Sequence, residues 1–225
     1  MSVGKIPEKI FELIDKTHFG DMILIEYEPF YAAELVTMIL LEYARKGGLS
    51  IIIDDNLDCL HIVKEHLRFL GIEEDFKDAF VIKTGGKLNI GTVVGRVKIE
   101  SEPAIYIKRY EEISSKTFTE VDRAVNIVLG LERLFAFVQN TREFYTLIGS
   151  IQSFLGNEKR KAFYIIDKNV ALSLKYNLLP ELERIASTVV YISGEHGEGK
   201  VIFKKSPYSD LVGQEFKFSL KDLIG

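Results

Sequence analysis

The chain has 225 residues, 47% of them hydrophobic, which is enough to bury a full core, and we expect one domain over residues 1–225. A formal net charge of −4 and scattered basic residues weigh against a nucleic-acid partner, which needs a basic face. A single cysteine excludes an internal disulfide, and no apolar run reaches about 18 residues, so we expect a cytoplasmic protein without a membrane partner.

The first part of the chain predicts alternating helices and strands. Residues 6–17 place Ile10, Leu13 and Ile14 on one face of an amphipathic helix. Short Ile-rich runs are typical of strands buried on both faces, and longer periodic stretches that stop at glycine predict helices. These patterns predict strands over 21–27, 49–56 and 78–86, separated by helices over 31–48 and 57–71. This alternation predicts right-handed crossovers and a parallel sheet.

The later part interrupts this order and then resumes it. Residues 83–101 mix glycines with alternating Val and Ile, which predicts a β-hairpin or an excursion at the rim of the sheet. The patterns that follow predict a helix and a core strand over 117–138, a helix over 141–159, a strand over 160–169, a helix and a strand over 178–195, and edge strands over 199–207 and 214–220. The predicted fold class is α/β, with three layers, a largely parallel central sheet covered by helices on both faces, and antiparallel edge strands near the C-terminus.

Residues 23–36, ILIEYEPFYAAELV, are typical of a buried strand, a short loop and the start of a helix. In nucleotide-binding α/β folds such a loop is rich in glycine. Its backbone N–H groups, a lysine and a Ser/Thr hydroxyl hold the phosphates and magnesium. Here the loop contains neither glycine nor lysine, and it carries Glu26 and Glu28. The sequence therefore has the position of a phosphate site without its residues.

The order of the segments resembles the KaiC-like branch of the RecA-fold ATPases, and more closely an uncharacterised archaeal family near that branch. The segments that carry the resemblance are residues 6–25, 40–56, 125–135 and 180–207. The resemblance implies a RecA-like fold and relatives that assemble side by side, so a homo-oligomer is possible. Lys204 and Lys205 resemble the position from which a neighbouring subunit's triphosphate is contacted in the family's rings, although ordinary surface lysines are expected here.

The resemblance also implies that the chemistry is missing. Ala32 stands in place of the phosphate-binding lysine, and Ala33 in place of the magnesium-binding hydroxyl. Glu26 and Tyr31 replace loop glycines, and Leu129 falls where the metal-associated aspartate belongs. A glutamate about 4 Å from a phosphate charge would be repelled by roughly 4 kcal/mol at an effective dielectric near 20. We therefore expect a pseudo-ATPase that is not an enzyme and has no nucleotide cofactor, catalytic residue or metal.

The loop's aromatic residues suggest what replaced the nucleotide. Tyr27, Phe30 and Tyr31 stand at the carboxyl end of a parallel strand, where open α/β sheets bind ligands. They either fill the old cleft or form a contact surface, since Tyr and Phe are favoured in protein interfaces. With Glu26 and Glu28 they would present a mixed apolar and acidic surface that prefers Lys or Arg. The predicted function is a module that binds a protein or peptide.

Asp54 and Asp55 support an alternative function. They end the second strand, where the resembling family has an acidic pair that activates water. The alternative function is therefore an enzyme of different chemistry that uses Asp54 and Asp55 in a remodelled cleft. The simpler interpretation is that Asp55 or Asn56 caps the next helix. A third possibility, a nucleic-acid-associated RecA relative, needs a basic stripe with exposed aromatic residues. The cations that could form such a stripe are Lys108, Arg109, Lys116 and Arg123.

Two further sites are conceivable at the start of the second helix. Asp54, Asp58 and His61 could share one side of its first turns, and carboxylates with an imidazole suit a transition metal. Cys59 and His61 lie two residues apart and point to different faces of a helix, which argues against a nucleophile–base pair. Cys59 is instead expected to be a small core residue.

Overall fold

The computed structural model describes residues 8–28, 31–100, 102–195 and 198–219. Within these ranges the strands form one nine-stranded sheet in the order β4-β3-β2-β5-β6-β1-β7-β8-β9. The strands are β1 (Met22–Tyr27), β2 (Ser50–Asn56), β3 (Ala79–Thr84), β4 (Thr92–Val97), β5 (Ala124–Leu129), β6 (Arg160–Asp167), β7 (Thr188–Glu195), β8 (Glu198–Lys205) and β9 (Glu215–Ser219). The pairs from β4 to β7 are parallel, and β7–β8 and β8–β9 are antiparallel.

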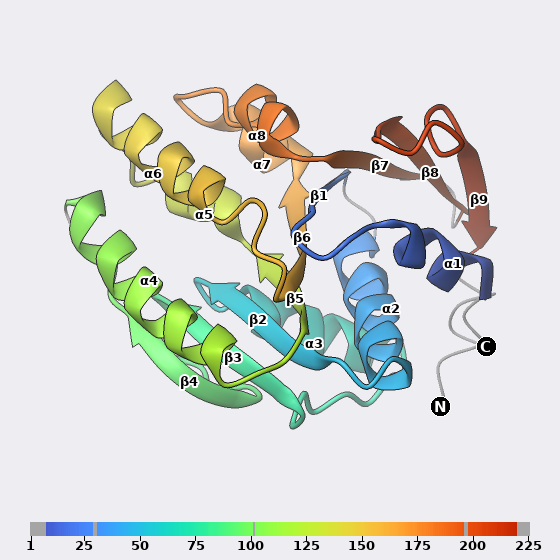
Figure 1. Cartoon of the computed structure of the whole chain (residues 1–225), viewed down its shortest axis with the longest axis horizontal. Coiled ribbons are helices and arrows are strands. Elements are labelled where there is room, and N and C mark those ends of the chain that lie inside the picture. Colours follow the sequence, from blue (N-terminus) through green and yellow to red (C-terminus); the bar gives the residue numbers. More distant parts are fainter. Residues whose placement is uncertain (1–7, 29–30, 101, 196–197, 220–225) are drawn as a thin grey trace.

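Helices cover both faces of this sheet. They are α1 (Glu8–Lys16), α2 (Ala32–Lys46), α3 (Cys59–Phe69), α4 (Pro103–Thr119), α5 (Leu131–Phe135), α6 (Thr141–Ser153), α7 (Lys168–Ser173) and α8 (Leu179–Ile185). Figure 1 shows α2 and α3 on one side of the sheet and α5 to α8 on the other. The predicted three-layer α/β fold with antiparallel C-terminal strands is confirmed. No helix in the described part of the chain is both long and apolar enough to cross a bilayer.

The core explains why the strands are continuous apolar runs. Successive side chains of a strand point to opposite faces, so Ile51 and Ile53 pack in the core cluster that contains the buried residues of α2 and α3. Ile52 packs on the other face with Phe118 of α4. Because helices bury both faces of β2, its three successive residues Ile51, Ile52 and Ile53 are all apolar.

The predicted hairpin over residues 83–101 is wrong. β4 lies at the edge of the sheet, as a rim segment would, but it runs parallel to β3 rather than antiparallel. The chain leaves the end of β3 and returns to its beginning, where Gly91 has a φ of 67°. A Cβ at Gly91 would lie 2.9 Å from the carbonyl oxygen of Phe76, so only glycine fits this return.

The sequence patterns also missed helices α4 and α7, while the core strand and the helix predicted within 117–138 correspond to β5 and α5. The longer of the two missed helices is α4, with Pro103 at its first position, and its buried face includes Tyr106 and Phe118. Proline is well tolerated at a helix start, since the N–H that it lacks would have no partner there. The short helices α5 and α7 follow β5 and β6 directly. Together with α6, these elements cover the sheet face opposite α2.

Candidate functional site

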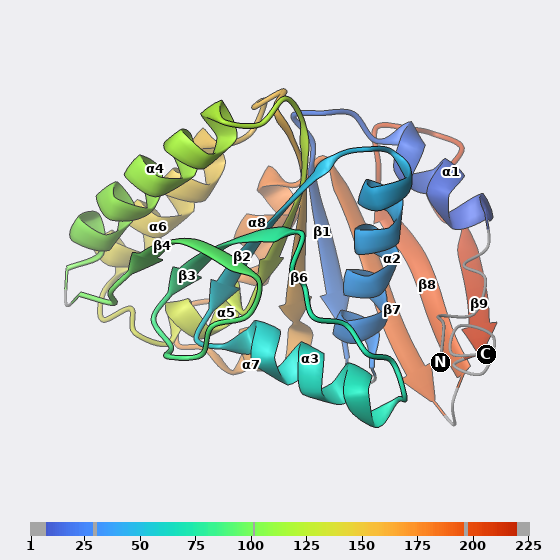
Figure 2. The same cartoon turned by 90° about the horizontal axis from the view of Figure 1, so that it is seen from below.

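The carboxyl ends of the central parallel strands form one edge of the sheet, which is the expected ligand position in open α/β folds. Tyr27 at the end of β1 lies opposite Asp167 at the end of β6, and Asp55 near the end of β2 lies opposite Leu129 at the end of β5. Figure 2 shows the arrowheads of β1 and β6 pointing to the edge at which α3, α5 and α7 lie. The predicted site residues of β1 and β2 therefore lie at the same edge of the sheet, but β5 and β6 separate the two strands.

Helix α2 begins at this edge with two buried alanines. Ala32 is 1% exposed and Ala33 is 8% exposed, and both belong to the core cluster under α2. Tyr31 precedes the helix, makes no side-chain cap, and is 38% exposed. The methyl groups at 32 and 33 thus pack inward and offer no charge or hydroxyl to an anion.

A glutamate of the chain itself occupies the first turn of α2. Glu34 is buried, and its Oε1 lies 2.6 Å from Nδ1 of His66 on α3. The ring of Tyr31 packs edge-on against His66 at 5.7 Å. An acidic side chain in a first turn interacts favourably with the positive end of the helix dipole. The start of α2 therefore carries an anionic side chain of its own.

Glu26 does not reach the surface expected for it. It is buried on the side of β1 opposite Tyr27, and its Oε2 accepts from Nζ of Lys204 at 3.0 Å. Its other oxygen has no hydrogen-bond partner among the described residues. Burial raises the pKa of Glu26, and the attraction of Lys204 offsets this only in part. Glu26 is therefore an internal acid and lies outside any contact surface.

The other loop residues differ in exposure. Glu28 lies near the surface and accepts from Nζ of Lys168 at 3.1 Å. Hydrogen bonds from Tyr191 and Lys168 lower its pKa. Tyr27 is half-buried against the α2 side of the core, and burial raises the pKa of its hydroxyl. Phe30 lies outside the described residues, so its role in a contact surface stays a prediction.

Asp54 and Asp55 point to opposite faces of β2 and do not form a joint acidic site. Asp55 faces α3, where its Oδ1 accepts from the N–H of Leu60 at 3.0 Å. Its Oδ2 binds Nζ of Lys83, which also donates to Oδ1 of Asp58 at 2.7 Å. Asp58 precedes α3 but makes no side-chain cap there, and the carboxylate of Asp55 accepts from the first turn instead, as the capping interpretation of Asp55 expects. Asp55 is thus held by a helix N–H and a buried lysine.

Asp54 faces α4 and α6. Its Oδ2 accepts from Nδ2 of Asn126 at 2.7 Å, and its Oδ1 has no hydrogen-bond partner among the described residues. Burial raises the pKa of Asp54, while the Asn126 amide, the charge of Arg160 and the nearby Tyr110 hydroxyl act in the opposite direction. Because Asp54 lies across the sheet from Asp55, the remodelled two-aspartate catalytic site is not formed.

The residues of the candidate metal site and of the candidate Cys–His pair do not form a site either. In the described ranges no group of three or more His, Cys, Asp or Glu side chains is placed to hold a metal ion, so Asp54, Asp58 and His61 do not converge. Cys59 is buried, as predicted, and burial raises the pKa of its thiol to about 12. A thiol with that pKa is a poor nucleophile at neutral pH.

The lysines of β8 have partners within the chain. Lys204 binds Glu26 and also Oε1 of Glu183 at 2.5 Å. Lys205 donates to the carbonyl oxygens of Glu183 and Ala186 at 2.7 and 2.6 Å. These carbonyls belong to the last turn of α8 and the residue after it, where a cation is favourable. Both lysines therefore stabilise the packing of α8 on β8.

One buried acid, Glu132, was not identified from the sequence. Glu132 follows the Gly130 turn after β5, is 2% exposed, and its Oε2 has no partner among the described residues. Burial raises the pKa of its carboxyl to about 7, and the negative charge of nearby Asp167 acts in the same direction. The signal in the sequence is an acid two residues after the glycine that ends a buried strand.

Comparison with known proteins gives one family and a fold. A family model described as "Pyrococcus protein of unknown function, DUF257" matches residues 12–217, and no curated protein matches. The chain is similar to the PH0250 protein of Pyrococcus horikoshii OT3, with 28% identity and a TM-score of 0.77 over 93% of this chain and 96% of that one.

Two more distant structures share the fold. The KaiC-like protein PH0186 of P. horikoshii OT3 is 8% identical, with a TM-score of 0.60 over 89% of this chain and 86% of that one. The flagellar accessory protein FlaH of Methanocaldococcus jannaschii is 13% identical, with a TM-score of 0.63 over 100% and 97%. The predicted resemblance to KaiC-like RecA folds is therefore confirmed at the level of the fold.

Proposed function

Because the chain belongs to the Pyrococcus family of unknown function DUF257 and has a RecA-like fold, we propose that it binds another protein or a peptide as a non-catalytic pseudo-ATPase. One observation carries this proposal. The first turn of α2 bears the buried carboxylate of Glu34, held by His66, beside the buried alanines 32 and 33. A helix start of this kind repels a second anion, because its favourable positive field is already used.

The exposed part of this edge supports a binding role. We call it the carboxyl-edge surface, and its members are Glu28, Tyr31, His66, Lys168 and Tyr191. Tyr31 and His66 are in ring contact, and Glu28 and Lys168 form an ion pair. Tyrosines supply much of the binding energy at protein interfaces, since a large ring is buried at little entropic cost.

The acids near the loop change the expected partner chemistry. Glu26, Glu28 and Glu34 each lie against a basic side chain of the same chain. Little unpaired negative charge is left to select Lys or Arg, so a basic partner no longer follows from the sequence. The proposed contact instead rests on the Tyr31 ring, with the ion pair of Glu28 at its rim.

Site-specific photocross-linking tests the proposal. p-Benzoylphenylalanine is placed at Tyr31 and, as a matched control, at Tyr145, which lies on α6 and is 52% exposed. In extract of the source organism, we expect a discrete cross-linked partner from position 31 and none from position 145. The substitution Tyr31→Asp should abolish capture by a tagged protein, and Tyr145→Asp should leave capture unchanged. Equal yields from both positions would remove this surface from consideration.

A further inference from the structure

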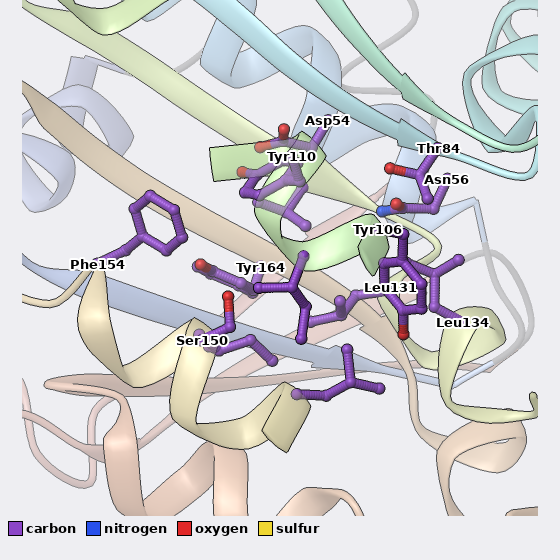
Figure 3. Close-up of a pocket in the computed structure, with 14 residues that line it drawn as sticks. Asp54, Asn56, Thr84, Tyr106, Tyr110, Leu131, Leu134, Ser150, Phe154 and Tyr164 are labelled. Carbon is purple, nitrogen blue, oxygen red and sulfur yellow. The ribbon is translucent and has the colours of Figure 1, made fainter. Parts of the chain in front are cut away.

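A pocket lies on the sheet face opposite α2, and it is independent of the proposed partner surface. Its volume is about 70 Å³, and it lies among β2, β6, α4 and α6. Four aromatic side chains form much of its wall: Tyr106, Tyr110, Phe154 and Tyr164. In Figure 3, Asp54 and Tyr110 lie together at the top of the view, with Phe154 to the left. An engineered cavity of about 150 Å³ holds benzene, so this pocket has room for a group of a few heavy atoms.

One oxygen of Asp54 makes this pocket a site for a hydrogen-bond donor. Asp54 lines the pocket and is 3% exposed. Asn126 donates to Oδ2, and the Tyr110 hydroxyl lies close enough to lower the pKa of the Asp54 carboxyl, but Oδ1 makes no hydrogen bond of normal geometry with the described residues. A buried charged group without a partner is costly. A donor bound in the pocket would satisfy it.

The only cation described beside Asp54 is directed elsewhere. Arg160 is buried in β6, where its Nη1 donates to Oδ1 of Asn126 at 2.7 Å and its Nη2 to the Tyr164 hydroxyl at 3.2 Å. Its guanidinium also lies 4.9 Å from the ring centre of Phe154. Arg160 therefore contacts Asp54 only through Asn126, and no direct hydrogen bond between Arg160 and Asp54 is formed among the described residues.

A second carboxylate lies next to the pocket. Ser150 of α6 lines the pocket and donates to Oε1 of Glu111 on α4 at 3.4 Å. Ser150, Tyr110 and Phe154 are half-buried, so the pocket reaches the surface between α4 and α6. When both carboxyl groups are ionised, the formal charges of Asp54, Glu111 and Arg160 sum to −1. Aromatic ring faces also attract cations.

We propose that this pocket binds the primary ammonium group of a small organic amine, with Asp54 Oδ1 as its acceptor. An ammonium group has three donors and a compact charge. One donor would pair with Asp54, and the pocket's tyrosine and serine hydroxyls are available acceptors for the others. The attached alkyl chain would leave between α4 and α6, past Ser150.

Isothermal titration with isosteric probes tests this proposal. The probes are n-propylammonium chloride and n-propanol, compared at equal ionic strength. We expect wild-type protein to bind n-propylammonium at least tenfold more tightly than n-propanol. Asp54→Asn keeps an acceptor for Asn126 and should bring the two affinities within about twofold. Equal affinities in the wild type, or no saturable binding of the amine, would overturn the proposal.

A second variant separates binding from folding. Ser150→Leu narrows the opening between α4 and α6 without touching Asp54 and should weaken n-propylammonium binding at least fivefold. The matched control is Ser153→Leu, because Ser153 is exposed on the same helix and does not line the pocket. Thermal unfolding of each variant shows that it is folded. Unchanged affinity in a folded Ser150→Leu variant would place the amine elsewhere and contradict the proposal.

Discussion

The methyl groups of Ala32 and Ala33 lie inside the core, at the positions where the resembling family carries a lysine and a hydroxyl. Glu34, one residue further on, pairs with His66. These three neighbouring positions are thus engaged in internal packing and in a contact between Glu34 and His66. The fold is retained because the strand before them and the helix after them keep the same apolar pattern.

Glu132 should make folding stability depend on pH. Its pKa rises from 4.5 to about 7 on burial, so between these values the native state holds a proton that the unfolded state has lost. Stability therefore falls as pH rises from about 4.5 to 7, by roughly 3 kcal/mol in total from this group. Glu132→Gln should remove this loss and be more stable than wild type at pH 8, with little difference at pH 4.5.

Urea unfolding at the two pH values measures this effect. The control is Glu112→Gln, because Glu112 is exposed on α4 and only pairs with Arg109. Comparing variants with wild type at each pH cancels the contribution of other titrating groups, including Glu26. A Glu132→Gln protein that gains nothing at pH 8 would show that the Glu132 carboxyl ionises at an ordinary pH.

At the scale of elements, α3 is joined to the end of β3 by charged groups. Lys83 of β3 is buried and binds both Asp55 and Asp58. Asp58 also accepts from the N–H groups of Lys87 and Leu88, which hold the loop that leads to β4. Gly86 is required there, because a Cβ would lie 2.3 Å from Oδ1 of Asp58. One lysine thus links β2, the start of α3 and the β3–β4 loop.

Removing that lysine should be strongly destabilising. Lys83→Met would leave two carboxylates without their cation, and breaking a buried ion pair costs about 3–5 kcal/mol. The control is Lys77→Met, which removes an exposed pair with Asp75 and should leave the free energy of unfolding nearly unchanged. Urea unfolding at neutral pH gives both values. Similar losses in the two variants would mean that the buried network contributes no more than a surface pair.

The sequence predicted most elements but not the site's connections. Helix α2 and strand β2 could be predicted from the spacing of apolar residues and from the glycines that end the helix, which are local signals. The direction of β4 could not be predicted in this way, because side chains alternate between the two faces equally in parallel and antiparallel pairs. The partners of Asp55 could not be predicted either. Lys83 is 28 residues away in the chain and meets Asp55 only because β2 and β3 pair in the sheet.

For the whole molecule, the sheet separates two sets of groups. The face of α2 and α3 carries Glu34, His66 and the buried alanines, and the opposite face carries Asp54 and the pocket under α4 and α6. Lys204 and Lys205 are satisfied within the chain, so a homo-oligomer, if formed, would not depend on their contact with a neighbour's nucleotide. The two proposed sites can therefore be tested separately.

Direct titration with ATP–Mg²⁺ tests the central claim, that side chains of the protein have replaced the triphosphate. Isothermal titration up to millimolar nucleotide should give no saturable heat, and the unfolding midpoint should not change. A ligand present at 100 times its Kd would instead stabilise the fold by about 2.7 kcal/mol. Saturable binding of ATP–Mg²⁺ that Glu34→Ala strengthens and Ala32→Asp abolishes would place nucleotide at the start of α2 and contradict the claim.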